Sequence, residues 1–173
     1  MLGCYTAGVP IAPISPAYSL ISSDHAKLKH CFGVVRPKVV FAQDSAMFAR
    51  AFDTLKALDP DLTFVSVDGG NGTIPLSDLT ATEPTAAVEA QRETIGHSTV
   101  AKYLFTSGST GRPKGYVRSH RSWVASFEGD ALEFGLGEDD VVLAPGSMAH
   151  SLFLYAAAHA LHEAAVGRVT AGG

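Results

Sequence analysis

Short runs of mainly apolar residues recur along the chain and are separated by longer stretches of mixed character. Such runs lie at residues 38–43, 62–67, 100–105 and 141–144. Runs of this length are typical of strands that are buried on both faces of a parallel sheet. We therefore predict a strand at each of them, and a further short strand at residues 116–118 that returns from the third run.

Apolar residues three or four positions apart predict helices in the stretches between these runs. The predicted helices span residues 1–8, 23–35, 45–58, 86–92, 119–134 and 151–166. The candidate N-terminal caps are Ser22 or Ser23, Asp44 or Ser45, and Ser119 or Ser122. A strand, a helix and a strand in succession imply parallel pairing through a right-handed crossover. The expected fold class is therefore α/β, with an open, mainly parallel sheet layer and flanking helices.

Two stretches of this pattern carry more specific expectations. The predicted helix before Gly135 has a largely apolar side formed by Trp123, Phe127, Leu132 and Phe134, which we predict to be core. Residues 68–98 contain many glycines and prolines and are predicted to form a long surface connection.

Composition and charge narrow the classes of function. The chain has 173 residues, 46% hydrophobic and 17% charged, as expected of a folded domain with a sizeable core. Its 13 basic and 17 acidic residues include no basic block, which argues against nucleic acid and favours small-molecule partners. Cys4 and Cys31 cannot form a disulfide framework, so we expect a reducing, cytoplasmic setting. The mainly apolar stretch at residues 148–167 also contains three histidines and Glu163, which favours a buried helix over a transmembrane one.

A loop rich in hydroxyl groups and glycines follows the apolar run at residues 100–105, and Lys114 closes it. The loop consists of Thr106, Ser107, Gly108, Ser109, Thr110 and Gly111. Glycines let the backbone turn its N–H groups toward an anion, and the hydroxyl groups are further donors. Pro113 restricts the backbone, so that Lys114 leaves the loop in a limited range of directions. This composition predicts a loop that binds phosphates.

Three other interpretations fit the residues of this loop less well. A Walker A loop needs a lysine directly after its second glycine and then Ser or Thr, whereas here Lys114 lies three residues after Gly111 and is followed by Gly115. A hydrolase nucleophile elbow, Gly-x-Ser-x-Gly, would need one more residue between the glycines. An ordinary Ser/Gly-rich turn accounts for four residues but not for the complete string of ten.

The string Thr-Ser-Gly-Ser-Thr-Gly-Arg-Pro-Lys-Gly at residues 106–115, with Ser119 and His120 shortly after it, closely resembles the signature loop of the adenylate-forming superfamily. This superfamily contains acyl- and aryl-CoA synthetases, luciferases and the adenylation domains of peptide synthetases. The resemblance implies that the loop binds the β- and γ-phosphates of ATP while a carboxylate attacks the α-phosphate. It also implies that Lys114 is catalytic, that CoA is a co-substrate, and that Mg²⁺ is held by a residue outside this chain.

A second resemblance concerns residues 144–150, where a strand, a proline and a short apolar turn end in His150. In the superfamily a histidine or aromatic residue in this place gates the acyl and adenylate pocket, which implies a catalytic role for His150. Nearby, His159, His162 and Glu163 stand in the reverse order of the His-x-x-Glu-His zinc pattern and have no evident third ligand. We therefore predict no metal site within this chain.

The resemblance extends more weakly over the rest of the chain. Residues 10–19, 24–30 and 100–105 are similar to feruloyl-CoA-type synthetases, whereas residues 150–155 are similar to certain smaller acyl-CoA synthetases. Both aryl and fatty acids therefore remain open as substrates. The resemblance implies that residues 1–173 form part of the large N-terminal AMP-binding (adenylation) domain. The phosphate-loop hairpin of that domain is expected at residues 100–118. The resemblance also implies that the chain corresponds to roughly a third of a typical member of the superfamily.

Two other hypotheses remain open at this point. The chain could be a nucleotide-binding module without catalysis, or a decayed fragment that retains the loop. It could also be an unrelated structural α/β domain. Because the resemblance covers only part of a domain, we also expect exposed core surface that favours self-association.

Overall fold

The computed structural model describes residues 2–106, 111–135, 143, 154–156 and 158–159. The chain divides into two compact units. One unit consists of Ile14–Ala86 and Phe105–Gly115. The other contains the described residues of Met1–Pro13, Ala87–Leu104 and Tyr116–Gly173.

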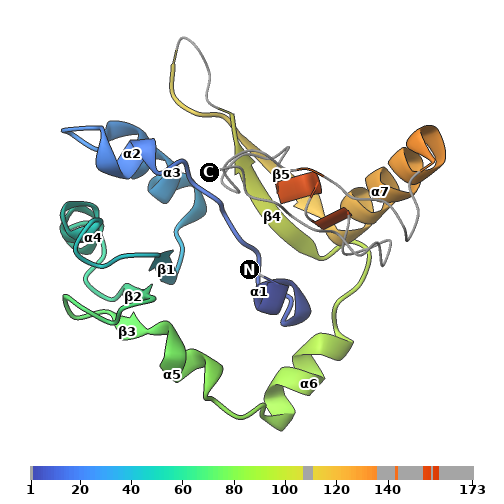
Figure 1. The fold of residues 1–173 in the computed structure, drawn as a ribbon, viewed down its shortest axis with the longest axis horizontal. Helices are drawn as coiled ribbons and strands as arrows, with labels where there is room; N and C mark the ends of the chain where they lie inside the picture. Colours follow the sequence, from blue (N-terminus) through green and yellow to red (C-terminus); the bar gives the residue numbers. More distant parts are fainter. Residues whose placement is uncertain (1, 107–110, 136–142, 144–153, 157, 160–173) are drawn as a thin grey trace. The chain divides into compact units, whose positions relative to one another are not determined.

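The first of these units is built on a three-stranded parallel sheet with the order β1-β2-β3 (Figure 1). Its strands are β1 (Val39–Ala42), β2 (Thr63–Ser66) and the two-residue β3 (Ile74–Pro75). Helix α4 (Ala49–Lys56) lies in the chain between β1 and β2, so the two paired strands are joined through a helix. This arrangement confirms the predicted α/β class and parallel pairing.

One face of the sheet is covered by α3 (Ala26–Val35) and α4. Val40 and Phe64, which are partners in the register of β1 and β2, pack against the buried cluster that these helices contribute. The buried members of the cluster are Leu28, Ala51, Leu55 and Leu62. The partly buried members are Ile14, Tyr18, Phe32, Val40 and Phe64. The core of this unit therefore lies between the helices and a single face of the sheet.

The other face of β1 is open. Val39 and Phe41 alternate with Val40 along the strand, and their side chains remain 56% and 55% exposed. The prediction that this strand is buried on both faces is therefore wrong for β1. An apolar run shows that a strand suits burial, but the cover must come from other elements, and no described element of this unit covers these two residues.

The helices of this unit begin later than the sequence pattern predicted. The Ser22 hydroxyl accepts the N–H of His25, and the Asp24 carboxylate accepts the N–H of Ala26, so these side chains stabilise a turn before α3. His25 then has a left-handed backbone, with φ 52°, at the cap of the helix. Likewise, Asp44 accepts the N–H of Met47, and the helix α4 starts two residues further on. Local side-chain hydrogen bonds competed here with helix initiation.

Four short elements were predicted from the sequence with different success. Helix α2 (Ala17–Leu20) was not predicted. Strand β3 and the adjoining α5 (Leu76–Thr80) interrupt the stretch that was predicted to be a surface connection throughout. Helix α6 (Ala86–Glu93) confirms the short helix predicted near the end of that stretch. A two-residue strand that contains a proline has too little periodicity to be recognised.

The other unit begins with α1 (Leu2–Thr6), which is followed by Gly8 with φ 67°, as the sequence predicted. Beyond Gly8 the chain is extended, and Ile11 forms a parallel bridge with Lys102 of strand β4. The unit also contains α7 (His120–Phe134), whose N-terminus is capped by Ser119.

Helix α7 confirms the predicted cap and half of its predicted apolar side. The Ser119 hydroxyl accepts the N–H of Ser122 at 3.2 Å. Trp123 and Phe127 are buried and pack with Leu154 in a second core cluster. Leu132 and Phe134, however, are 87% and 67% exposed, so their assignment to the core is wrong. Both lie in the last turn of the helix, where the described part of the chain offers them no packing partner.

Several predictions fall partly or wholly outside the described residues. Leu154–Ala156 and residues 158–159 are helical, in agreement with the helix predicted at 151–166, but the rest of that helix is not described. Only Leu143 of the strand predicted at 141–144 is described, so that strand stays a prediction.

Candidate functional site

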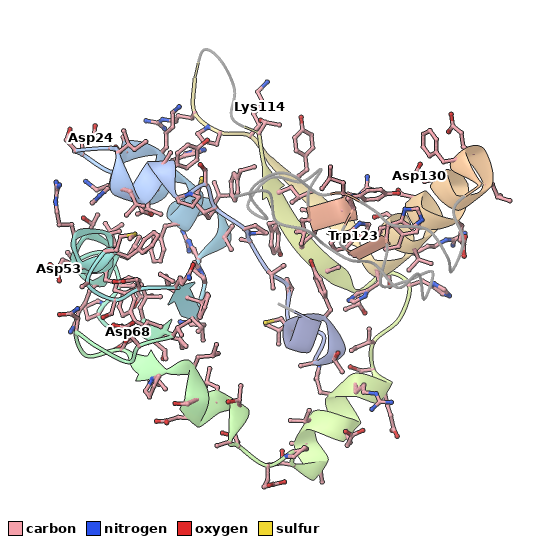
Figure 2. All side chains as sticks on the ribbon, viewed as in Figure 1. Asp24, Asp53, Asp68, Lys114, Trp123 and Asp130 are labelled. Atoms are coloured by element: carbon pink, nitrogen blue, oxygen red, sulfur yellow. The ribbon has the colours of Figure 1, made fainter. Side chains whose placement is uncertain are left out.

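The phosphate loop predicted from the sequence connects β4 (Val100–Phe105) and β5 (Gly115–Ser119), which form a two-stranded sheet. The N–H of Thr106 donates to the carbonyl oxygen of Lys114 at 3.0 Å, and the Thr106 hydroxyl lies 3.5 Å from the same oxygen. The two ends of the loop are therefore hydrogen-bonded to each other. Figure 2 shows the Lys114 side chain at the loop end of this hairpin.

Close packing below the loop supports this closed base. Pro113 is among the most completely buried residues of the described chain, although its neighbours Arg112 and Lys114 are exposed. A Cβ atom on Gly115 would lie 3.3 Å from the ring of Phe105, so the absence of a side chain lets that ring lie against the backbone. The loop thus leaves and rejoins the hairpin at a tightly packed position.

The structure covers the predicted site residues unevenly. It brings Thr106 and Lys114 together at the base of the loop, and it describes Gly111 as exposed. The remaining loop residues, Ser107, Gly108, Ser109 and Thr110, lie outside the described residues. His150 also lies outside them. The binding and catalytic roles assigned to all of these residues stay predictions.

A histidine that the sequence did not single out contacts the end of the loop. The Nε2 atom of His30, in helix α3, lies 2.9 Å from the carbonyl oxygen of Pro113. A carbonyl oxygen can only accept, so the imidazole must carry its proton on Nε2 and donate it. The two residues are 83 positions apart. No local motif could have revealed this contact.

A second unexpected feature is a buried lysine in the unit that contains α7. Lys102 is only 2% exposed, and its Nζ atom lies 2.9 Å from the centre of the Trp123 ring. Burial, with a smaller contribution from the charge of Arg118, lowers the pKa of Lys102 to about 7. Within the described part of the chain no carboxylate forms an ion pair with it. The face of an aromatic ring is its principal stabilising contact.

Polar atoms around this lysine are also buried without hydrogen bonds. The Tyr5 hydroxyl, the His120 Nε2 and the Trp123 Nε1 have no hydrogen-bond partner among the described residues. The three rings form a cluster, with the Tyr5 centroid 5.3 Å from that of Trp123 and 6.1 Å from that of His120. Both of these ring pairs approach edge to face, which is a favourable arrangement for packing.

A polar turn follows β2, at the strand ends where ligands often bind in open α/β sheets. Asp68 accepts hydrogen bonds from the backbone N–H and the hydroxyl of Ser45, and these bonds hold its pKa well below the usual range. Asn71 donates to the same hydroxyl, and Ser66 and Thr73 bond to each other. Because the polar atoms of this turn are used within it, we assign the turn a structural role.

Two further properties bear on the class of site. Among the described residues, no three His, Cys, Asp or Glu side chains are grouped so that they could hold a metal ion. In the same part of the chain, no helix is both long and apolar enough to cross a membrane.

The loop composition, its hydrogen-bonded base and the exposed Lys114 agree with the match to protein-family models. The model of the AMP-binding enzymes, described as "AMP-binding enzyme", matches residues 1–169. The chain belongs to this family. The predicted membership of the adenylate-forming superfamily is therefore confirmed.

Relatives and solved structures agree with this assignment. The chain is 53% identical over 57 residues to the uncharacterized acyl-CoA ligase YhfT of Bacillus subtilis (strain 168), an alignment that covers 33% of the chain. Its fold matches VinN with a TM-score of 0.71 at 22% identity, over 98% of the chain. It also matches ATP-bound MatB from Rhodopseudomonas palustris with a TM-score of 0.67 at 21% identity, over 96% of the chain.

The chain matches only part of each of these three proteins. It spans 12% of the length of YhfT, 39% of the VinN chain and 31% of the MatB chain. The likeness to the two solved structures shows the fold, and the match to YhfT places the chain beside acyl-CoA ligases.

Proposed function

We propose that this chain contributes the phosphate-binding part of an ATP-dependent acid–CoA ligase. In the first step a carboxylate oxygen bonds to the α-phosphorus of ATP, and pyrophosphate leaves to give an acyl-adenylate. In the second step the thiol of CoA bonds to the acyl carbon, and AMP leaves to give a thioester. The observation that carries the proposal is the hydrogen-bonded loop base, where Thr106 and Lys114 meet in a chain of the AMP-binding family.

The proposed role of the loop is electrostatic. Its backbone N–H groups and hydroxyls donate to the β- and γ-phosphates, and the Lys114 ammonium offsets the charge that develops as pyrophosphate leaves. Lys114 suits this role because its side chain is exposed while its backbone is held by Thr106. Mg²⁺, when bound, supplies further neutralisation of the phosphates, and we propose that the residue that holds it lies outside this chain.

The acyl pocket and the class of acid are proposed from the resemblances found in the sequence. We propose that His150 lines the pocket for the acyl group and that the acid is an aryl or fatty acid. The name of YhfT, an acyl-CoA ligase, supports CoA as the acceptor of the acyl group. The small number of cysteines in the chain, two, supports a cytoplasmic setting.

A second candidate function is a nucleotide-binding module that retains the loop without catalysis. The loop at residues 106–115 supports this alternative equally well, because a loop that binds phosphates does not by itself supply catalysis. Aligning ATP with a carboxylate requires contacts to adenine, ribose, metal and acyl group together. Misplacement by about 1 Å can lower the rate by about 10²-fold, so phosphate contacts alone are insufficient for fast catalysis.

We therefore expect the purified chain to bind ATP but to form CoA thioesters far more slowly than a ligase of this family. ATP binding is measured by calorimetry, and catalysis by carboxylate-dependent pyrophosphate exchange and thioester formation. Slow exchange that needs both the carboxylate and Lys114 supports the ligase, whereas ATP binding without any exchange supports the binding module. A chain that binds no ATP contradicts both functions, and rapid thioester formation contradicts the expected dependence on contacts outside this chain.

A further inference from the structure

We propose that His30 is a positioning residue for the phosphate loop. Its Nε2–H holds the carbonyl group of Pro113 and thereby fixes the direction in which Lys114 leaves the loop. This inference rests on the proposed function, in which Lys114 binds the phosphates of ATP. His30 touches no phosphate in this account, and it acts only through the backbone before the lysine.

The first step of the argument is the peptide plane between Pro113 and Lys114. The carbonyl of Pro113 and the N–H of Lys114 belong to one planar peptide group, so a hydrogen bond to that carbonyl orients both. His30 supplies this bond at 2.9 Å. The pyrrolidine ring of Pro113 restricts φ on the other side, and the residue is almost completely buried. The peptide group before Lys114 therefore has little freedom to rotate.

The second step is the peptide group after Lys114. Its carbonyl oxygen accepts the N–H of Thr106 at 3.0 Å. Lys114 is thus held on both sides, by His30 through the preceding peptide and by Thr106 through the following one. Only its side chain remains exposed. A lysine held in this way loses less conformational freedom when it binds a phosphate, and the affinity gains accordingly.

The third step is the rigidity of the helix that carries His30. Helix α3 contributes the buried residues Leu28 and Cys31, which lie on either side of His30 in the sequence. Leu28 belongs to the core cluster under the β1–β2 sheet. His30 itself is partly buried, so its ring is held between the core and the loop. The Pro113 carbonyl is therefore held by a part of the unit that is packed into the core.

His25, five residues earlier, shows how a histidine with a structural role differs. Its two ring nitrogens bond to the Thr54 hydroxyl and to the Ser19 carbonyl, at 2.8 and 3.0 Å. These bonds link the start of α3 to α4 and to α2, and neither partner belongs to the loop. The single described hydrogen bond of the His30 ring, in contrast, goes to the residue directly before the proposed phosphate ligand.

The test compares two replacements of His30 in the complete 173-residue chain. His30→Phe retains a ring without a donor, whereas His30→Gln retains an N–H donor near the position of Nε2. Lys29→Met changes an exposed residue of the same helix and is the control. We expect His30→Phe to weaken ATP binding about two- to tenfold, as for loss of one neutral hydrogen bond. His30→Gln should recover at least half of this loss, and Lys29→Met should change nothing.

AMP serves as the probe that separates positioning from general damage to the fold. AMP lacks the β- and γ-phosphates, so its affinity should be the same in all these variants. Equal losses for ATP and AMP, or ATP affinity that His30→Phe leaves unchanged, would overturn the inference. If His30→Phe does not fold, His30→Asn decides instead, because its shorter side chain places its donor away from the Pro113 carbonyl: it should weaken ATP binding and leave AMP binding unchanged.

A spectroscopic measurement tests the contact without nucleotide. Nitrogen NMR of the imidazole in the wild-type chain should show the proton of the neutral ring on Nε2, and amide exchange at Thr106 should be faster in His30→Phe. A proton on Nδ1 would contradict the contact. If the wild-type chain binds no ATP while these spectra agree with the contact, the proposed function fails and the geometry of His30 stands, so the two failures can be told apart.

Discussion

Replacing Lys114 with alanine is expected to weaken ATP binding by about 1.5–3 kcal/mol, the range for a hydrogen bond with a charged partner. This corresponds to a rise in the dissociation constant of roughly 10- to 150-fold. The backbone carbonyl of Lys114, which accepts from Thr106, is retained in this variant, so the loop base should stay closed. Isothermal titration with ATP in the presence of Mg²⁺ measures the effect.

Two further variants control this result. Lys38→Ala removes an exposed lysine of the same unit, at the start of β1, and should leave ATP affinity unchanged. Lys114→Arg keeps the charge and should recover part of the affinity, although the guanidinium group is larger and planar. If Lys114→Ala binds ATP as tightly as the wild-type chain, Lys114 is no phosphate ligand and the proposed role of the loop is wrong.

The second large effect is expected from the buried lysine, Lys102. Its pKa is about 7 in the folded chain, against an ordinary value of 10.5. Between these values the unfolded chain binds a proton that the folded chain has released, so the free energy of unfolding rises with pH. The rise approaches about 1.4 kcal/mol per pH unit above the folded pKa. Between pH 7 and 9 we expect a gain of about 2 kcal/mol.

Other groups limit the pH window in which this effect is clear. Burial raises the pKa of Cys31 from 9.0 to about 11, so the unfolded chain loses a proton first and stability falls as pH rises above 9. Burial likewise raises the pKa of Tyr5 above its ordinary 10.0, which adds to the fall at still higher pH. The interval from pH 7 to 9 therefore isolates Lys102.

Urea unfolding at several pH values measures this dependence. Lys102→Met has a similar length without a charge, so it should be more stable than the wild-type chain at pH 7 and nearly independent of pH up to 9. Lys27→Met, which replaces an exposed lysine near Tyr18, should keep the wild-type profile. An equal slope in Lys102→Met and the wild-type chain would show that Lys102 is not the titrating group.

The parts of the fold that the sequence predicted are those set by local patterns. Mainly apolar runs predicted β1, β2 and β4, and the interval between the first two, filled by α4, predicted parallel pairing. Ser119 was predicted as a possible cap of α7, because the hydroxyl of a capping serine accepts the N–H of a residue only three positions later, as it does here from Ser122. The binding role of the loop at residues 106–115 could be proposed for the same reason, since its hydroxyl groups, glycines and lysine lie in one short string, and this role stays a prediction.

The parts that were missed depend on contacts between distant segments. Phe41 lies in an apolar run, yet the pattern cannot show that one face of β1 lacks cover. The charge of Lys102 predicts a place at the surface. Its contact with the Trp123 ring depends on the folded chain and could not be predicted from the sequence. His30 and Pro113 are in contact although they lie 83 positions apart in the sequence, and no spacing rule connects them.

The open face of β1 agrees with the expectation that the chain exposes core surface. Val39 and Phe41 are apolar and more than half exposed, and they lie on the same side of the strand. Exposed apolar patches of this kind favour association. We propose that self-association of the chain, where it occurs, involves this face, and the binding experiments therefore need a concentration series.

The central claim is that the loop from Thr106 to Lys114 binds the β- and γ-phosphates of ATP. Backbone amide NMR of the 173-residue chain during parallel titrations with ATP and AMP tests it most directly. The account predicts that ATP shifts the amide signals of Thr106, Gly111 and Lys114, and that AMP at the same concentration leaves these three signals in place. Unchanged loop signals with ATP, or equal shifts with AMP, would contradict it.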